Sequence, residues 1–203
     1  ISNAAAFLNM VLPDADLKAK EYLGIIEGET QTSEKIIAEL LDFTRLQIAE
    51  KQPTAVAEII GSAFLRYPAP GRIEVTRDIP ADLPDVCVNR PQIEQVLGNL
   101  VENAYQAMPN GGRLEISAQL QPGSKEELGF VRIHIKDSGE GIAPENLSKI
   151  FEPLFTTKAK GIGLGLAICR KYMEANGGRI TAASEPGTGT TFLMDLPLRQ
   201  EEK

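Results

Sequence analysis

The sequence is poor in several residue types on which common functional classes depend. Its 203 residues contain no tryptophan, one histidine and two cysteines. Cys87 and Cys169 form no Cys-x-x-Cys pair, which argues against a zinc centre or a redox motif. Without a secretory signal, two such cysteines are typical of reduced thiols in a cytoplasmic protein. A single histidine also excludes a histidine-rich metal site.

Basic charge and long apolar runs are scarce as well. The chain has 21 Lys and Arg against 28 Asp and Glu, a formal charge of −7, whereas a nucleic-acid partner requires a concentrated basic face. No stretch approaches the roughly 20 apolar residues of a membrane span. We therefore expect a cytoplasmic domain without a nucleic-acid partner or membrane contact of its own, either free or as the cytoplasmic part of a membrane-anchored protein. Since the chain begins at Ile1 inside an apolar-periodic run, we expect it to be part of a longer protein.

The first 52 residues show helical periodicity. Pro13 separates a short Ala-rich segment, 1–12, from the segment 16–52, in which apolar residues such as Leu23 and Ile26 recur three or four positions apart. Two helices joined by a short loop predict an antiparallel hairpin. Because one hairpin buries too little apolar surface, we predict a homodimer in which two copies form a four-helix bundle.

Pro53 marks a change of pattern, after which strand and helix signals alternate. Strands are predicted where short apolar or alternating runs lie between turn residues, at 73–76, 86–88, 113–118, 131–136, 179–184 and 190–196. Helices are predicted at 89–108 and 164–176. The expected fold class is α+β: the helical hairpin, followed by an α/β sandwich that has a mixed sheet with helices on one face.

Two asparagines lie on one face of the predicted helix 89–108. Asn99 and Asn103 are four residues apart, and Gln106 follows about one turn later. Asparagine is mildly unfavourable inside a helix, so the pair requires an explanation. Amide oxygens suit Mg²⁺, a hard cation that also keeps waters and substrate phosphates. The alternative is that these side chains form the solvated polar face of an amphipathic helix.

A carboxylate and two glycines follow the predicted strand 131–136, as Asp137-Ser-Gly139-Glu-Gly141. The glycines would let the backbone approach a flat ligand, while Asp137 accepts a hydrogen bond from an exocyclic amine such as that of adenine. The same pattern is common in turns and calcium loops, which is the alternative for this segment taken alone.

A second glycine-rich segment, 161–165, opens the predicted helix 164–176. Free backbone N–H groups and the helix dipole can bind phosphates there, and Lys158 adds a positive charge. The glycine spacing matches neither the P-loop nor the dinucleotide-binding fingerprint. A flexible surface loop is the alternative, but the two phenylalanines of the preceding segment 151–155 would anchor it.

The order of these motifs resembles that of sensor histidine kinases. Five motifs resemble, in this order, the N, G1, F, G2 and final Gly-Thr boxes of that family. They are Asn99-x-x-x-Asn103-Ala, Asp137-x-Gly-x-Gly, Phe151-x-Pro-x-Phe, Gly161-x-Gly-x-Gly and Gly187-Thr-Gly189-Thr. The hairpin also looks like the dimerisation and phosphoacceptor domain of the family, so the resemblance covers nearly the whole chain. The sequence of residues 103–112 and the short lid at 156–161 are most similar to the nitrogen-regulation-type branch.

The resemblance implies a site for ATP and Mg²⁺. Asn103 would hold Mg²⁺ with Asn99 facing the triphosphate, Asp137 would bind the adenine amine, and Lys158 would hold the phosphates beneath a lid. The residues implied for ATP binding are Asn99, Asn103, Gln106, Asp137, Gly139, Gly141, Ile142, Thr157, Lys158, Gly161, Ile162, Gly163, Leu164, Gly165 and Thr190. Among these, Ile142 would pack on the base, and Thr190 would lie near it.

The implied activity is that of a protein histidine kinase with a dimerisation domain at 1–52 and a catalytic domain at 53–203. The γ-phosphoryl group of ATP would pass to a histidine on the dimerisation helix, and then to an aspartate of a response-regulator receiver domain. Related gyrase-type and chaperone ATPases have a water-activating Glu where this chain has Asn99, so transfer is preferred to hydrolysis. The alternatives are an interaction module that binds ATP without transfer, a free-running ATPase of the same superfamily, and a serine or threonine kinase of that superfamily.

Two positions depart from the pattern of the family. Many members have an adenine-stacking aromatic where this chain has Ala107, and Tyr105 is expected to lie off that face. The acceptor histidine of the family opens the first hairpin helix, before an acidic residue and Asn-Pro, whereas the single histidine here, His134, is predicted on the polar side of a strand. We therefore expect the chain to hold the phosphate-donor half of the reaction, without the acceptor.

Overall fold

The computed structural model describes residues 1–11, 16–44, 50–123, 129–158 and 161–198. The chain divides into two compact units, Ile1–Leu46 and Gln47–Lys203. Among the described residues, no helix combines the length and the apolar character needed to cross a membrane.

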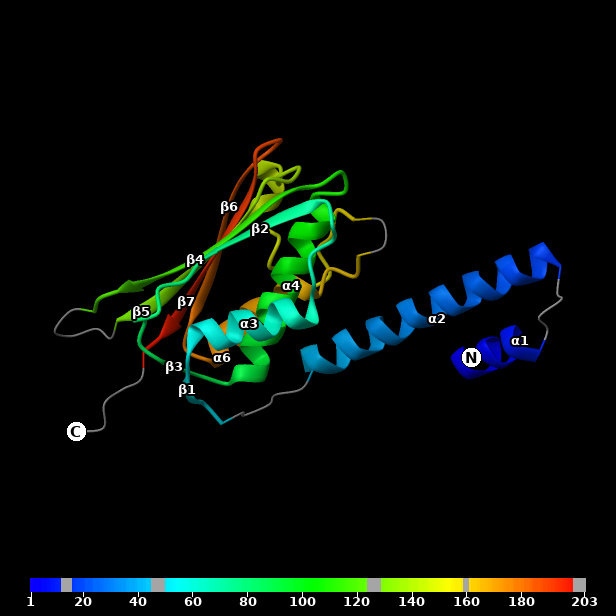
Figure 1. Cartoon of the computed structure of the whole chain (residues 1–203), viewed down its shortest axis with the longest axis horizontal. Helices are drawn as coiled ribbons and strands as arrows, with labels where there is room; N and C mark the ends of the chain where they lie inside the picture. The colour runs from blue at the N-terminus through cyan, green and yellow to red at the C-terminus, as the bar shows by residue number, and fades with distance from the viewer. Residues whose placement is uncertain (12–15, 45–49, 124–128, 159–160, 199–203) are drawn as a thin grey trace. The chain divides into compact units, whose positions relative to one another are not determined.

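The first unit consists of two helices, α1 (Ser2–Val11) and α2 (Leu17–Thr44). The helices pack against each other and run in opposite directions (Figure 1). The Asp16 carboxylate caps α2 by accepting the N–H of Ala19 at 2.7 Å. The predicted extension of the second helix to residue 52 is wrong at its end, because Gln52 begins a strand. Pro53 explains this end, since a proline disfavours helical geometry at the residue before it.

The second unit is built on a five-stranded mixed sheet with the strand order β2-β4-β5-β7-β6. Its strands are β2 (Ile73–Asp78), β4 (Gly112–Gln121), β5 (Phe130–Asp137), β6 (Arg179–Glu185) and β7 (Gly189–Pro197). Among the strand pairs that the described residues form in this sheet, β2–β4 alone is parallel. A separate antiparallel pair joins β1 (Gln52–Thr54) to β3 (Val86–Val88).

Helices cover one face of this sheet, as predicted (Figure 1). They are α3 (Val56–Arg66), α4 (Arg90–Ala107), the single turn α5 (Pro144–Leu147) and α6 (Gly165–Ala175). Strand β5 shows how the sequence assigns the two faces. Its apolar residues Val131, Ile133 and Ile135 are at most 1% exposed, so the alternating residues Arg132 and His134 lie on the open face.

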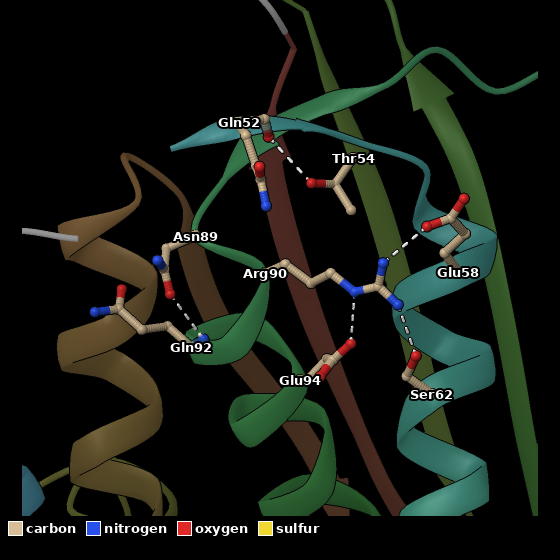
Figure 2. A network of polar contacts seen from close by, with 8 residues as sticks. All are labelled: Gln52, Thr54, Glu58, Ser62, Asn89, Arg90, Gln92 and Glu94. Atoms are coloured by element: carbon tan, nitrogen blue, oxygen red, sulfur yellow. Dashed lines mark hydrogen bonds and ion pairs between the residues drawn. The ribbon is translucent and has the colours of Figure 1, made fainter. Parts of the chain in front are cut away.

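Helix α3 is absent from the sequence-based prediction. Its buried residues Val56, Ile59, Ile60 and Ala63 have the i, i+3, i+4, i+7 spacing of an amphipathic helix, so the signal was present. Helix α3 packs along α4, and Arg90 at the start of α4 joins the two. The Arg90 guanidinium donates to Glu58 and Ser62 of α3, both at 2.8 Å, and to Glu94 at 2.7 Å (Figure 2).

The start of α4 is held by a buried amide network. The Asn89 side chain caps the helix by accepting the N–H of Gln92 at 3.1 Å (Figure 2). Asn176, which is 1% exposed, accepts the Asn89 N–H at 2.6 Å and donates at 2.8 Å to the Gln92 side chain. Asn176 also donates to the Tyr172 carbonyl at 2.8 Å. One asparagine therefore ties the end of α6 to the first turn of α4.

Replacing Asn176 by alanine is expected to lower the free energy of unfolding by about 2–3 kcal/mol. The Asn89 N–H and the Gln92 side chain, which is 6% exposed, would lose their partner, and a buried unsatisfied group costs about 1–3 kcal/mol. Urea unfolding of the two proteins measures the difference. Asn110→Ala, in the exposed turn after α4, is the matched control and should stay within about 0.5 kcal/mol. Equal losses in both variants would contradict the network.

Candidate functional site

Two amide oxygens on α4 converge on a single cation. Asn103 and Gln106 are three residues apart on one face of the helix, and the Lys158 ammonium donates to Asn103 Oδ1 at 2.8 Å and to Gln106 Oε1 at 2.7 Å. The lid segment that carries Lys158 is thereby brought to the N box. Because Mg²⁺ is a hard cation that takes oxygen ligands and keeps waters and substrate phosphates beside them, the donor set fits a magnesium site. In the described part of the chain, no cluster of three or more His, Cys, Asp or Glu side chains offers another metal site.

Asn99 lies on the same helix but has different partners. Its Nδ2 donates to the Gly165 carbonyl at 3.3 Å and lies 3.7 Å from Cys169 Sγ, so its amide faces the first turn of α6. Burial raises the pKa of Cys169 to about 12, which keeps the thiol protonated. It can therefore donate to the Val96 carbonyl at 3.8 Å. Asn99 thus joins α4 to the helix that follows the glycine-rich segment.

Asp137 ends β5 as a nearly buried carboxylate, 4% exposed. Its Oδ1 accepts the N–H of Gly139 at 2.9 Å and that of Thr190 at 3.2 Å. Burial raises the pKa of Asp137, although these two hydrogen bonds lower it in part. The two bonds use only part of the acceptor capacity of a carboxylate, which suits Asp137 to bind a further donor.

Two glycines let the surrounding loops pack tightly on each other. Gly141 has φ +71°, and a Cβ there would collide with the Glu185 carbonyl. Gly189 has φ +120°, and a Cβ there would collide with the Asp137 carbonyl. Glycine is required at both positions because other residues rarely adopt these φ values and because another part of the backbone fills the space.

A serine that the sequence interpretation missed connects these loops. The Ser184 hydroxyl accepts the N–H of Ile142 at 2.8 Å, donates to the Gly189 carbonyl at 2.8 Å and lies 2.9 Å from the Thr190 hydroxyl. The available signal was its place immediately before the turn 185–189, which sets it opposite Thr190 in a hairpin.

The glycine-rich segment is anchored at its base by the preceding aromatic motif. Phe151 packs edge-to-face on Phe192 of β7, with ring centroids 6.5 Å apart. The Leu154 N–H donates to the Gly163 carbonyl at 2.9 Å. Among the remaining predicted site residues, Thr157 and Gly161 are exposed, Ile162 and Gly165 are half-buried, and Leu164 is buried. Residues 159–160 of the lid lie outside the described part of the chain.

The two positions that depart from the expected pattern have clear surroundings. The carbonyl of Ala107 accepts the Glu140 N–H at 3.2 Å, so this end of α4 lies against the Asp137 loop. Tyr105 points elsewhere, with its hydroxyl donating to the Tyr67 carbonyl at 3.3 Å. His134 lies on the open face of the sheet, with its Nε2 3.0 Å from Gln119 Nε2. Burial and the nearby charge of Arg132 lower the pKa of His134.

Comparison with known proteins gives consistent matches. Residues 88–200 match the family model "Histidine kinase-, DNA gyrase B-, and HSP90-like ATPase". The signal transduction histidine-protein kinase AtoS of Escherichia coli is 32% identical over 90% of this chain, which spans 30% of that kinase. Sporulation kinase E of Bacillus subtilis is 31% identical over 88% of this chain, which spans 24% of that kinase.

Solved structures of histidine kinases are similar to most or nearly all of this chain. The catalytic domain of histidine kinase ThkA has a TM-score of 0.60 and 32% identity, covering 73% of this chain and 95% of that domain. A structure of ThkA in complex with the response regulator TrrA has a TM-score of 0.73 and 28% identity, covering 97% of this chain and 57% of that one.

Proposed function

Because the chain belongs to the family of histidine kinase-, DNA gyrase B- and HSP90-like ATPases and carries the ATP-binding catalytic domain of a sensor histidine kinase, we propose that it binds Mg²⁺-ATP and donates the γ-phosphoryl group to a histidine. In this proposal residues 53–203 form the catalytic domain and 1–52 the dimerisation domain of a homodimer. The phosphoryl group then passes to an aspartate of a response-regulator receiver domain. The sequence of residues 103–112 supports membership of the nitrogen-regulation-type branch.

The observation that carries the proposal is the convergence of Asn103, Gln106 and Lys158. Phosphoryl transfer asks mainly for positioning and for neutralisation of phosphate charge, and this cluster supplies oxygen ligands and a cation together. Asn103, assisted by Gln106, would hold Mg²⁺, which neutralises charge on the phosphates when bound. Since the Lys158 ammonium uses the same oxygens, it is expected to leave them when the nucleotide binds and to pair with a phosphate.

Asp137 is proposed to bind the adenine end of the nucleotide. A buried carboxylate with remaining acceptor capacity favours a ligand that presents an amine, and adenine presents one. The backbone N–H of Ile142 donates to Ser184, and that of Thr190 donates to Asp137. Ile142 and Thr190 are therefore proposed to border the base. With Ala107 in place of an aromatic, stacking on the base is expected to depend on apolar side chains such as Ile142.

Transfer to a protein acceptor is favoured over hydrolysis by the surroundings of Asn99. A water nucleophile needs a general base. Asn99 has a side-chain amide, which is not a base, and its nitrogen donates a hydrogen bond to the Gly165 carbonyl. His134 is not proposed as the acceptor, because it lies on strand β5 and is not followed by an acidic residue and Asn-Pro. The acceptor histidine is therefore proposed to lie on another polypeptide segment.

A phosphotransfer assay tests this function. The chain is incubated with γ-labelled ATP, Mg²⁺ and a polypeptide that carries a histidine followed by an acidic residue and Asn-Pro. Acid-labile, base-stable label on that polypeptide is expected. ATP binding without label would instead indicate an interaction module, and steady phosphate release without an acceptor would indicate an ATPase.

A further inference from the structure

The inner face of the β6–β7 hairpin changes from apolar to polar at one end. The register pairs Ile180 with Met194 and Ala182 with Phe192, and the next pair on the same face is Ser184 with Thr190. Thr190 is 4% exposed. Ser184 is half-buried. This polar pair at the end of an apolar ladder therefore requires partners, and these come from the two loops that border Asp137.

The Ser184 hydroxyl has its full hydrogen-bonding capacity in use. A hydroxyl has one proton to donate and two acceptor positions. The N–H of Ile142 can only donate and the carbonyl of Gly189 can only accept, and each lies 2.8 Å from Ser184 Oγ. The remaining partner, the Thr190 hydroxyl at 2.9 Å, then donates its proton to Ser184. Thr190 is left with lone pairs alone for any further partner.

Thr190 in turn is connected to the buried carboxylate. Its backbone N–H donates to Asp137 Oδ1 at 3.2 Å, so Thr190 contacts Ser184 through its hydroxyl and Asp137 through its backbone. With this proton direction, Thr190 Oγ1 and Asp137 are two neighbouring acceptors. Such a pair favours an amine and disfavours a keto oxygen, which would meet lone pairs on both sides.

We propose that Ser184 is a positioning and specificity-determining residue of the nucleotide site. It orients the hydroxyl proton of Thr190 away from the base and holds Ile142 beside it, so that the site prefers a 6-amino purine to a 6-keto purine. This inference rests on the proposed function, since it assumes that the base lies at Asp137. Without the Ser184 hydroxyl, Thr190 can rotate and donate its proton to a keto oxygen.

Calorimetric titration of the whole chain with ATP and with inosine triphosphate tests the proposal. Ser184→Ala is expected to lower the ratio of ATP affinity to inosine triphosphate affinity by about tenfold, the equivalent of one hydrogen bond. Ser184→Thr keeps the hydroxyl and should retain the wild-type ratio within about twofold. Ser117→Ala, on the open face of β4, is the matched control and should leave the ratio unchanged.

The outcomes separate this inference from the proposed function. An unchanged ratio in Ser184→Ala, or equal losses of affinity for both nucleotides, would overturn the specificity role and leave ATP binding by the wild type intact. If Ser184→Ala fails to fold, a reduced ratio in Ser184→Thr would overturn the proposal, and a ratio within twofold would support it. Absence of ATP binding by the folded wild type would overturn both the proposed function and this inference.

Discussion

Replacing Asp137 by asparagine is expected to weaken ATP binding by about 100-fold or more and to remove the preference for ATP over inosine triphosphate. The oxygen of an asparagine can still accept the N–H groups of Gly139 and Thr190 that Asp137 Oδ1 accepts now. The side-chain nitrogen of asparagine, however, is a donor at the place where Asp137 has its second acceptor oxygen. The amine of adenine would then meet a second donor, whereas the keto oxygen of inosine would meet a partner.

The same substitution is expected to stabilise the fold at neutral pH. Burial raises the pKa of Asp137 in the folded protein. This folded-state pKa lies above the unfolded value of about 3.9. The protonated carboxyl group therefore contributes its full stability below the unfolded pKa, and this contribution is lost as the pH rises through the folded-state pKa. The charged group therefore costs stability at pH 7. A neutral amide removes that cost, so the variant should gain stability at pH 7 and little at pH 3.5.

Two measurements check this variant. Calorimetric titration with each nucleotide gives the affinities, and urea unfolding at pH 7 and pH 3.5 gives the stabilities. Asp82→Asn, in the exposed loop between β2 and β3, is the matched control and should change neither. An unchanged ATP affinity would show that the base lies elsewhere, and a loss of stability at pH 7 would contradict the assigned cost of burying the charge.

Replacing Asn103 by alanine is expected to abolish the Mg²⁺-dependent part of ATP binding, a loss of about 100-fold. The substitution removes one of the two amide oxygens that now share the Lys158 ammonium. Gln106 alone leaves the cation with a single side-chain oxygen, too few to hold it against water. The fold should be unaffected within about 0.5 kcal/mol, because Asn103 is partly exposed on the surface of α4.

Titration with ATP in Mg²⁺ and in EDTA separates the Mg²⁺-dependent part of the ATP affinity from the part that does not depend on Mg²⁺. The wild type should bind more tightly in Mg²⁺, and Asn103→Ala should bind equally weakly in both. Asn110→Ala, in the turn after α4, should behave as the wild type. A variant that keeps the difference between Mg²⁺ and EDTA would show that Asn103 does not hold the ion.

The two variants also test the direction in which the nucleotide binds. Asp137→Asn should change the preference for the base and keep the dependence on Mg²⁺. Asn103→Ala should do the reverse. The opposite pattern would mean that the base and phosphate ends of the site have been exchanged.

Much of the local structure was predictable because it follows from backbone periodicity. Alternation at 131–136 predicted β5 and its two faces, and the four-residue spacing of Asn99 and Asn103 predicted that both lie on one face of the helix that became α4. Helix α3 could have been predicted by the same reasoning. The end of α2 was placed wrongly because the apolar pattern was followed as far as Pro53, whereas Gln52 already belongs to β1.

The sequence by itself determined which elements form and which chemical groups are available to a nucleotide: amide oxygens on a helix, a carboxylate at a strand end, and glycines beside it. Only the tertiary structure decided which of these groups meet. Thr190 reaches Asp137 across 53 residues, and Lys158 reaches Asn103 across 55. It also showed that Asn99 faces Gly165 and that Ser184 connects the two loops beside Asp137. Periodicity depends on near neighbours, whereas these contacts depend on strand order and helix packing, which bring distant segments together.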